Sequence, residues 1–113
     1  MRHDPKSYLW DIQQAAQRIN SLTAETTFDE YNGDWKVSLL VERLFIIIGE
    51  AMTRLETHHP DIASQITDYR DIIGFRIILV HRYPEIRNQE IWEIIQQKLP
   101  TLLTEVTNLL EQP

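Results

Sequence analysis

The sequence predicts an all-α protein, a bundle of four to five helices. Apolar residues recur at spacings of three and four along most of the chain, which is the period of an amphipathic helix. No segment alternates strictly between apolar and polar residues, and no Asn-Gly turn joins two strand-like runs. Together these observations favour a helical bundle over any fold that contains a sheet.

The first predicted helix begins after Asp4, which can cap it, with Pro5 suited to the first turn. Its apolar stripe consists of Tyr8, Leu9, Ile12, Ala15, Ala16, Ile19 and Leu22. The tetrapeptide TFDE (27–30) then has the pattern of a capping box and predicts a short helical turn. The tripeptide NGD (32–34) is a break, at which a long helix could also begin.

A long helix is predicted from Trp35 to about Thr57. Its apolar positions are Val37, Leu40, Val41, Leu44, Ile47, Ile48, Ala51 and Leu55, and a period sustained over more than five turns outweighs the β-branched residues among them. Helical geometry is unfavourable before a proline, so the chain should break before Pro60, where a short helix can start.

The next helix contains the stretch RIILVHRY (76–83). Asp68 can cap it, Asp71 favours its positive N-terminal end, and the dipeptide YP (83–84) ends it. Asn88 can cap a final helix, in which Pro100 should cause a break or a kink. The apolar positions of this last segment are Trp92, Ile95, Leu99, Leu102, Leu103, Val106, Leu109 and Leu110.

Length and composition indicate one domain that spans residues 1–113. The chain has no cysteine, which excludes a disulfide framework, an iron–sulfur cluster and a thiol nucleophile, and suits a reducing cytosol. The N-terminus lacks the apolar segment of a signal peptide, and the longest apolar run, LFIII (44–48), is too short to cross a bilayer. We therefore expect a cytoplasmic protein with no membrane partner.

The charge is unevenly distributed. The formal net charge of −6 argues against broad nucleic-acid binding, which needs a basic face. Residues 70–87 are the only locally basic window, because four arginines there outnumber two acidic residues for a net charge of +2. The six residues are Arg70, Arg76, Arg82, Arg87, Asp71 and Glu85. Charge alone is equally compatible with a chance cluster.

Arg76 and His81 are residue types that suit metal-free cleavage of RNA. The guanidinium fork matches phosphate oxygens, and histidine exchanges protons near neutral pH. Histidine would activate the ribose 2′-hydroxyl or protonate the leaving oxygen, while arginine would stabilise the charge that develops at phosphorus. One such histidine per chain supplies one of these roles at a time, whereas a symmetric dimer would supply both.

The five-residue spacing places Arg76 and His81 about 140° apart around a helix axis, so they do not share a face. Two arrangements could bring them together. The helix could end near Val80, so that His81 folds back in the following turn. Alternatively, two chains could pair across a two-fold axis, which brings residues near the axis together in pairs. The pattern Arg-x4-His by itself occurs by chance in many proteins.

Other residues have simpler interpretations. Glu50 lies in an apolar stretch, where an unpaired charge is costly, so it could pair with an arginine such as Arg76. His58 and His59 are adjacent and point in different directions, so we expect neither a metal nor a cofactor. The three tryptophans, at positions 10, 35 and 92, are most simply core or interface residues.

Four segments in order resemble the HepT-like family: DPKSYLWDIQQAAQRI, ERLFIIIGEA, YRDIIGFRIILVHRY and IWEIIQQKLPTLL. These are HEPN-domain ribonuclease toxins of the toxin–antitoxin type, paired with MNT-type nucleotidyltransferase antitoxins. The resemblance implies a helical bundle that forms a homodimer, with an RNase site at the interface. The family's Arg-x4-His motif corresponds to Arg76 and His81, and its tyrosine, which the antitoxin modifies with AMP, corresponds to Tyr83. Glu50, Arg70 and Arg82 are accessory or RNA-binding candidates.

The chain departs from the family at one position. The residue after the arginine is often polar in the family, and here it is Ile77. Two hypotheses therefore remain. The chain is either a metal-independent endoribonuclease toxin that AMPylation (transfer of AMP) of Tyr83 silences, or a non-catalytic helical module that binds a nucleotidyltransferase and positions its substrate.

Overall fold

The computed structural model describes residues 4–81 and 86–113, and these form an all-α bundle. The predicted all-α class is confirmed, and the described residues contain no strand. In chain order the helices are α1 (Pro5–Thr23), α2 (Phe28–Gly33), α3 (Trp35–His58), α4 (Pro60–Ala63), α5 (Tyr69–His81), α6 (Asn88–Gln97) and α7 (Leu99–Glu111). Within the described ranges, no helix is long and apolar enough to cross a membrane.

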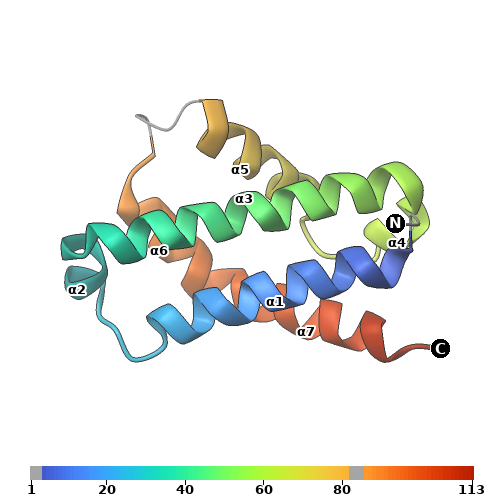
Figure 1. The fold of residues 1–113 in the computed structure, drawn as a ribbon, viewed down its shortest axis with the longest axis horizontal. Helices are drawn as coiled ribbons and strands as arrows, with labels where there is room; N and C mark the ends of the chain where they lie inside the picture. The colour runs from blue at the N-terminus through green and yellow to red at the C-terminus, as the bar shows by residue number, and fades with distance from the viewer. Residues whose placement is uncertain (1–3, 82–85) are drawn as a thin grey trace.

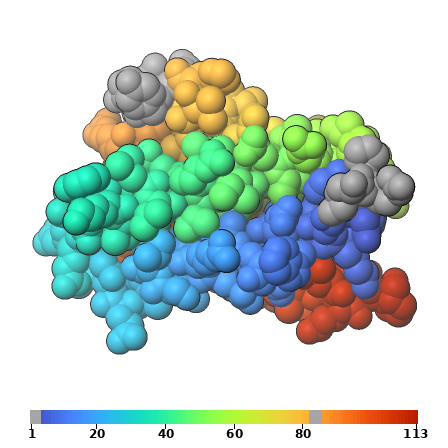
Figure 2. All heavy atoms as spheres, in the orientation of Figure 1, coloured from blue at the N-terminus to red at the C-terminus, as the bar shows by residue number. Residues whose placement is uncertain are grey.

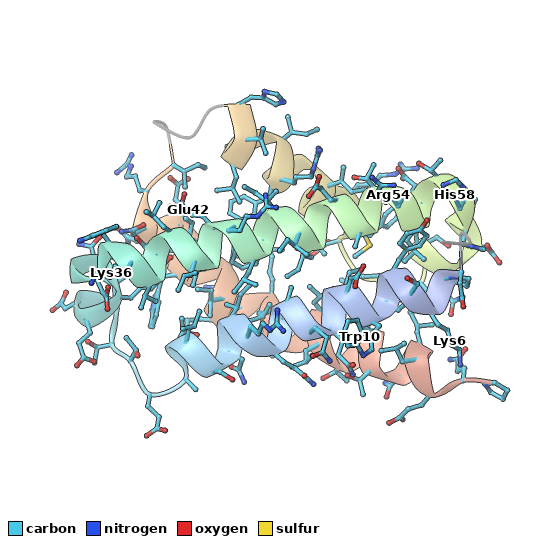
Figure 3. The ribbon with its side chains drawn as sticks, viewed as in Figure 1. Lys6, Trp10, Lys36, Glu42, Arg54 and His58 are labelled. Carbon is cyan, nitrogen blue, oxygen red and sulfur yellow. The ribbon has the colours of Figure 1, made fainter. Side chains whose placement is uncertain are left out.

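Five longer helices make the described bundle, and α2 and α4 are short connections between them. The long α3 runs through the middle, with α1 along one side and α5 along the other (Figure 1). The predicted break at Pro100 is confirmed, since α6 ends at Gln97 and α7 continues in a new direction with Pro100 in its first turn. The amino group of Lys6 donates to the carbonyl oxygen of Leu110 at 3.1 Å, which fixes the start of α1 beside the end of α7 (Figure 3).

The caps of the first two helices form as predicted, and Asp34 caps the third. The Asp4 carboxylate accepts the backbone N–H of Lys6 at 2.9 Å. Thr27 and Glu30 form the capping box of α2, in which the Thr27 N–H donates to the Glu30 carboxylate at 2.9 Å. After the break before Trp35, Asp34 caps α3, and its carboxylate accepts hydrogen bonds from two N–H groups of the first turn.

The predicted caps of α5 and α6 are wrong. Asp68 has a positive φ of 59°, and its carboxylate accepts a hydrogen bond from the Lys98 amino group at 3.0 Å instead of one from the first turn of α5. Asn88 is the first residue of α6, and its side-chain amide donates to the Asn32 side chain at 3.0 Å. In both cases the side chain that was predicted to cap a helix forms a hydrogen bond with a residue far away along the chain.

Two polar contacts and an aromatic cluster fix the ends of α5 and α6. The N–H and hydroxyl of Thr67 donate to the two carboxylate oxygens of Glu105 at 2.8 and 2.7 Å, which joins the chain before α5 to α7. At the start of α6, the Trp92 ring lies 5.3 Å from the Tyr31 ring and 6.2 Å from that of Phe28. The core interpretation of the other two tryptophans is wrong, since Trp10 and Trp35 are exposed.

Candidate active site

Arg76 lies on α5 where that helix crosses closest to α3. A Cβ placed on Gly49 of α3 would lie 2.3 Å from the Arg76 Cβ and 2.9 Å from its Cγ, both far inside van der Waals contact. Only glycine therefore allows this approach, and the aliphatic part of Arg76 lies against the backbone of Gly49. Gly49 was not among the residues predicted to form the site. The available signal was a glycine in the interior of an apolar helix, where it costs about 1 kcal/mol relative to alanine.

The guanidinium of Arg76 has an unsatisfied donor. Its Nε is buried and makes no hydrogen bond within the described part of the chain, although leaving a charged donor without an acceptor is costly. Among the described residues no carboxylate forms an ion pair with it. Arg76 is therefore a cation held in place by packing. Its Nε is closed to solvent, so an anion such as a phosphate would meet the terminal nitrogens of the guanidinium.

Glu50 does not pair with Arg76, so the suggested ion pair is absent from the described residues. Glu50 instead lines a cleft of about 370 Å³ between α1 and α3, together with Asp11 and Arg54. Figure 3 shows Arg54 on the C-terminal half of α3. Gly49 faces α5 and its neighbour Glu50 faces the cleft beside α1, because successive helical residues are rotated by about 100°.

His81 is the last residue of α5, and it is exposed. The helix therefore ends one residue after Val80, and His81 belongs to its last turn and not to a following turn. Since both residues belong to one continuous helix, the rotation of about 140° separates Arg76 from His81. One chain does not bring the two side chains to a common face.

The other candidates divide into two groups. Arg70 is exposed at the start of α5, where its Nε lies 3.7 Å from the Glu56 carboxylate and its guanidinium lies over the Tyr69 ring. It precedes Arg76 by six residues, which is roughly 9 Å along the helix axis. Arg82 and Tyr83 lie outside the described residues.

Several apolar side chains on α5 and α3 are exposed. Ile77 is 45% exposed and Val80 43%, and with the partly buried Ile73 they form a stripe at the helical spacing i, i+4, i+7. Leu39 and Leu40, on the first half of α3, are 54% and 53% exposed. Figure 2 shows the end of α5 standing out from the face that α1 and α3 form.

The comparisons with known proteins identify relatives of the whole chain. The family model described as ribonuclease HepT-like matches residues 12–109. A Methanocaldococcus jannaschii protein named as a candidate RNase is 28% identical over 97% of this chain and 90% of its own length. A Thermococcus cleftensis protein named as a candidate ribonuclease HepT is 29% identical over 90% of this chain and 92% of its own. A candidate RNase of Caldanaerobacter subterraneus is 27% identical over 96% of both chains. No solved structure matches the chain.

Proposed function

Because the chain belongs to the ribonuclease HepT-like family, we propose that it is a metal-independent endoribonuclease toxin whose site combines Arg76 and His81 from two chains. The observation that carries this proposal is Arg76 itself, a cation that packing against Gly49 fixes on α5 and that forms no ion pair in the described part of the chain. It lies in the only basic window of an acidic protein, where a phosphate would be attracted.

The proposed reaction needs no group beyond these side chains and the RNA. One histidine takes the proton of a ribose 2′-hydroxyl, whose oxygen attacks the adjacent phosphorus. The bond from phosphorus to the 5′-oxygen breaks, and a second histidine gives that oxygen a proton. The products are a 2′,3′-cyclic phosphate and a 5′-hydroxyl. Arg76 stabilises the negative charge that accumulates on the phosphate oxygens during the attack.

A symmetric homodimer supports this chemistry in two ways. It supplies two copies of His81, one as base and one as acid, and it brings Arg76 of one chain near His81 of the other if the α5 helices meet at the axis. It also covers apolar surface, since Ile77 and Val80 flank the end of α5 and are nearly half exposed in the single chain.

Control by a nucleotidyltransferase antitoxin is the second part of the proposal. Tyr83 follows His81 by two residues in the sequence, so an AMP group on its hydroxyl would add bulk and negative charge next to the proposed site. Such an adduct would exclude RNA phosphates from the same region. Co-expression with an MNT-type nucleotidyltransferase should add one or more AMP masses to the peptide that holds Tyr83, and an unmodified peptide would contradict this part.

The catalytic proposal is tested with purified protein and cellular RNA in EDTA. We expect His81→Ala and Arg76→Ala to lower the cleavage rate by at least about a hundredfold, the usual size of a lost proton-transfer or charge-stabilising group. Arg18→Ala, an exposed arginine on α1, is the matched control and should leave the rate unchanged. The proposal fails if the wild type does not cut RNA, or if the site variants cut as fast as it does.

Ile77 favours a second candidate, a non-catalytic module that binds a nucleotidyltransferase. Its exposed aliphatic side chain offers no hydrogen bond to a substrate where family members often have a polar residue. A wild-type chain that does not cut RNA but retains a nucleotidyltransferase in a co-purification experiment would support this candidate. Ile77→Asn would then be informative, because gained cleavage would identify residue 77 as the cause.

A further inference from the structure

An open cavity of about 460 Å³ lies between α5 and the joint of α6 and α7. Its apolar walls come from α3, α5 and α7 and include Phe45, Ile48, Ile72, Phe75, Ile78 and Leu102. α5 packs on α3 through Gly49 and Arg76, and another part of its surface, which includes Ile72 and Ile78, faces this cavity. The volume is within the range of about 300–1,000 Å³ that is usual for sites of small molecules.

Gly74 keeps this space open. It lines the cavity in the interior of α5, and a Cβ placed on it would have no atom within 4 Å, apart from those of its own helix and chain neighbours. Alanine would favour the helix and no neighbour excludes it, in contrast to Gly49. The apolar hollow beside this glycine is therefore wide enough to admit a small molecule.

The charged groups at the mouth of the cavity leave one carboxylate available. Lys98 donates to Asp68 at 3.0 Å, and Arg70 lies 3.7 Å from Glu56, so both cations are engaged. Asp71 has no ion-pair partner within 4 Å in the described ranges, although it lies near enough to Lys98 to stabilise that charge. The mouth is also held in place, since the contact with Lys98 fixes Asp68 in its left-handed conformation.

We propose that this cavity binds a small molecule with an apolar body and a cationic head, such as an arylalkyl amine. The body would lie between Phe75, Ile78 and Leu102, and the ammonium group would lie at Asp71. Charge complementarity favours this ligand, because Asp71 has no ion-pair partner within 4 Å among the described residues, whereas Lys98 and Arg70 each have one. The site is distinct from Arg76 and His81, and its occupancy does not depend on the proposed ribonuclease activity.

The test uses the full-length protein with labelled methyl groups and three probes that share one body: 3-phenylpropylamine, 3-phenylpropanol and 3-phenylpropanoate. In an NMR titration, we expect saturable shifts of the Ile78 and Leu102 methyl signals. The amine should bind about two- to fivefold more tightly than the alcohol, which is the size of one exposed ion pair. Asp71→Asn should remove this preference. Absence of saturable shifts overturns the site, and tightest binding of the carboxylate overturns the cationic head.

A variant that fills the cavity tests whether the probes bind there. Gly74→Leu places a side chain into the open space and should abolish binding of all three probes while circular dichroism shows an unchanged helix content. Gly33→Leu is the matched control, since Gly33 also has no atom near its added Cβ but lies on α2, and it should bind as the wild type does. Unchanged binding to Gly74→Leu overturns the assignment. A loss of oligomer mass in Gly74→Leu, with no saturable shift in the wild type, would instead show a second copy in the cavity.

Discussion

The helices α1 and α5 both lie along α3, but they pack against it in different ways. α1 buries a continuous stripe of side chains, Tyr8, Leu9, Ile12, Ala15, Ala16, Ile19 and Thr23, whereas Leu79 is the one buried residue of α5. α5 rests on α3 through contacts that include Gly49 with Arg76 and Phe45 with Phe75, and part of its surface faces an open cavity. The α1 side therefore contributes more buried surface, and the α5 side retains exposed apolar and charged groups.

The largest difference should appear in stability. Ile12→Ala on α1 removes a side chain with no exposed surface, and we expect a loss of about 3 kcal/mol in the free energy of unfolding. Ile77→Ala on α5 should cost less than about 0.5 kcal/mol in a single chain, because nearly half of that side chain is already exposed. Urea unfolding at several protein concentrations measures both.

Equal losses in the two variants at low concentration would contradict the comparison. A loss in Ile77→Ala that grows with protein concentration would instead show that this side chain is buried between two chains.

Gly49 and Gly74 give a more specific test of how α5 is held. Gly49→Ala should destabilise the protein by about 1–2 kcal/mol, since the new Cβ overlaps the Arg76 Cβ and the loss exceeds the gain in helix propensity. Gly74→Ala should stabilise it by up to about 1 kcal/mol, because the added methyl group meets open space. Thermal unfolding followed by circular dichroism measures both changes.

RNA cleavage extends this test to the site. Gly49→Ala should also lower the cleavage rate, because it moves Arg76, whereas Gly74→Ala should leave the rate unchanged. Destabilisation by Gly74→Ala, or neutrality of Gly49→Ala, would show that the crossing of the two helices is not as described.

The smallest effect concerns Glu42 on α3, whose pKa is raised by burial. A carboxyl with a raised folded-state pKa binds more protons folded than unfolded, so its contribution to stability falls as pH rises from the unfolded value through the folded one. Glu42→Gln should therefore stabilise the protein at pH 7 and lose this advantage near pH 4. Unfolding of wild type, Glu42→Gln and the exposed control Glu25→Gln at both values provides the measurement. An equal gain for Glu25→Gln would show a general charge effect.

Local patterns in the sequence predicted the helices well because most of them depend on near neighbours. The caps by Asp4 and the box of Thr27 and Glu30 involve residues two or three positions apart. The caps assigned to Asp68 and Asn88 were wrong because Lys98 and Asn32 bind these side chains, over separations of 30 and 56 residues. No local pattern contains such partners.

The candidate site shows the same division. Arg76, His81, Tyr83 and the accessory residues were selected from residue type, spacing and resemblance, and their roles stay predictions. The importance of Gly49 was not visible, since it depends on where α5 crosses α3. The suggested pairing of Glu50 with Arg76 failed for the same reason, because the rotation of α3 directs Glu50 toward α1.

The sequence by itself determined the helical period, the breaks at Pro60 and Pro100 and the family to which the chain belongs. Each of these depends on residues that are close together along the chain. Only the tertiary structure decided that α5 remains helical through His81, that Arg76 lies on Gly49 with its Nε unsatisfied, and that a cavity separates α5 from α7. These features depend on side chains that meet across the bundle, where close packing and the rotation of each helix fix the contacts.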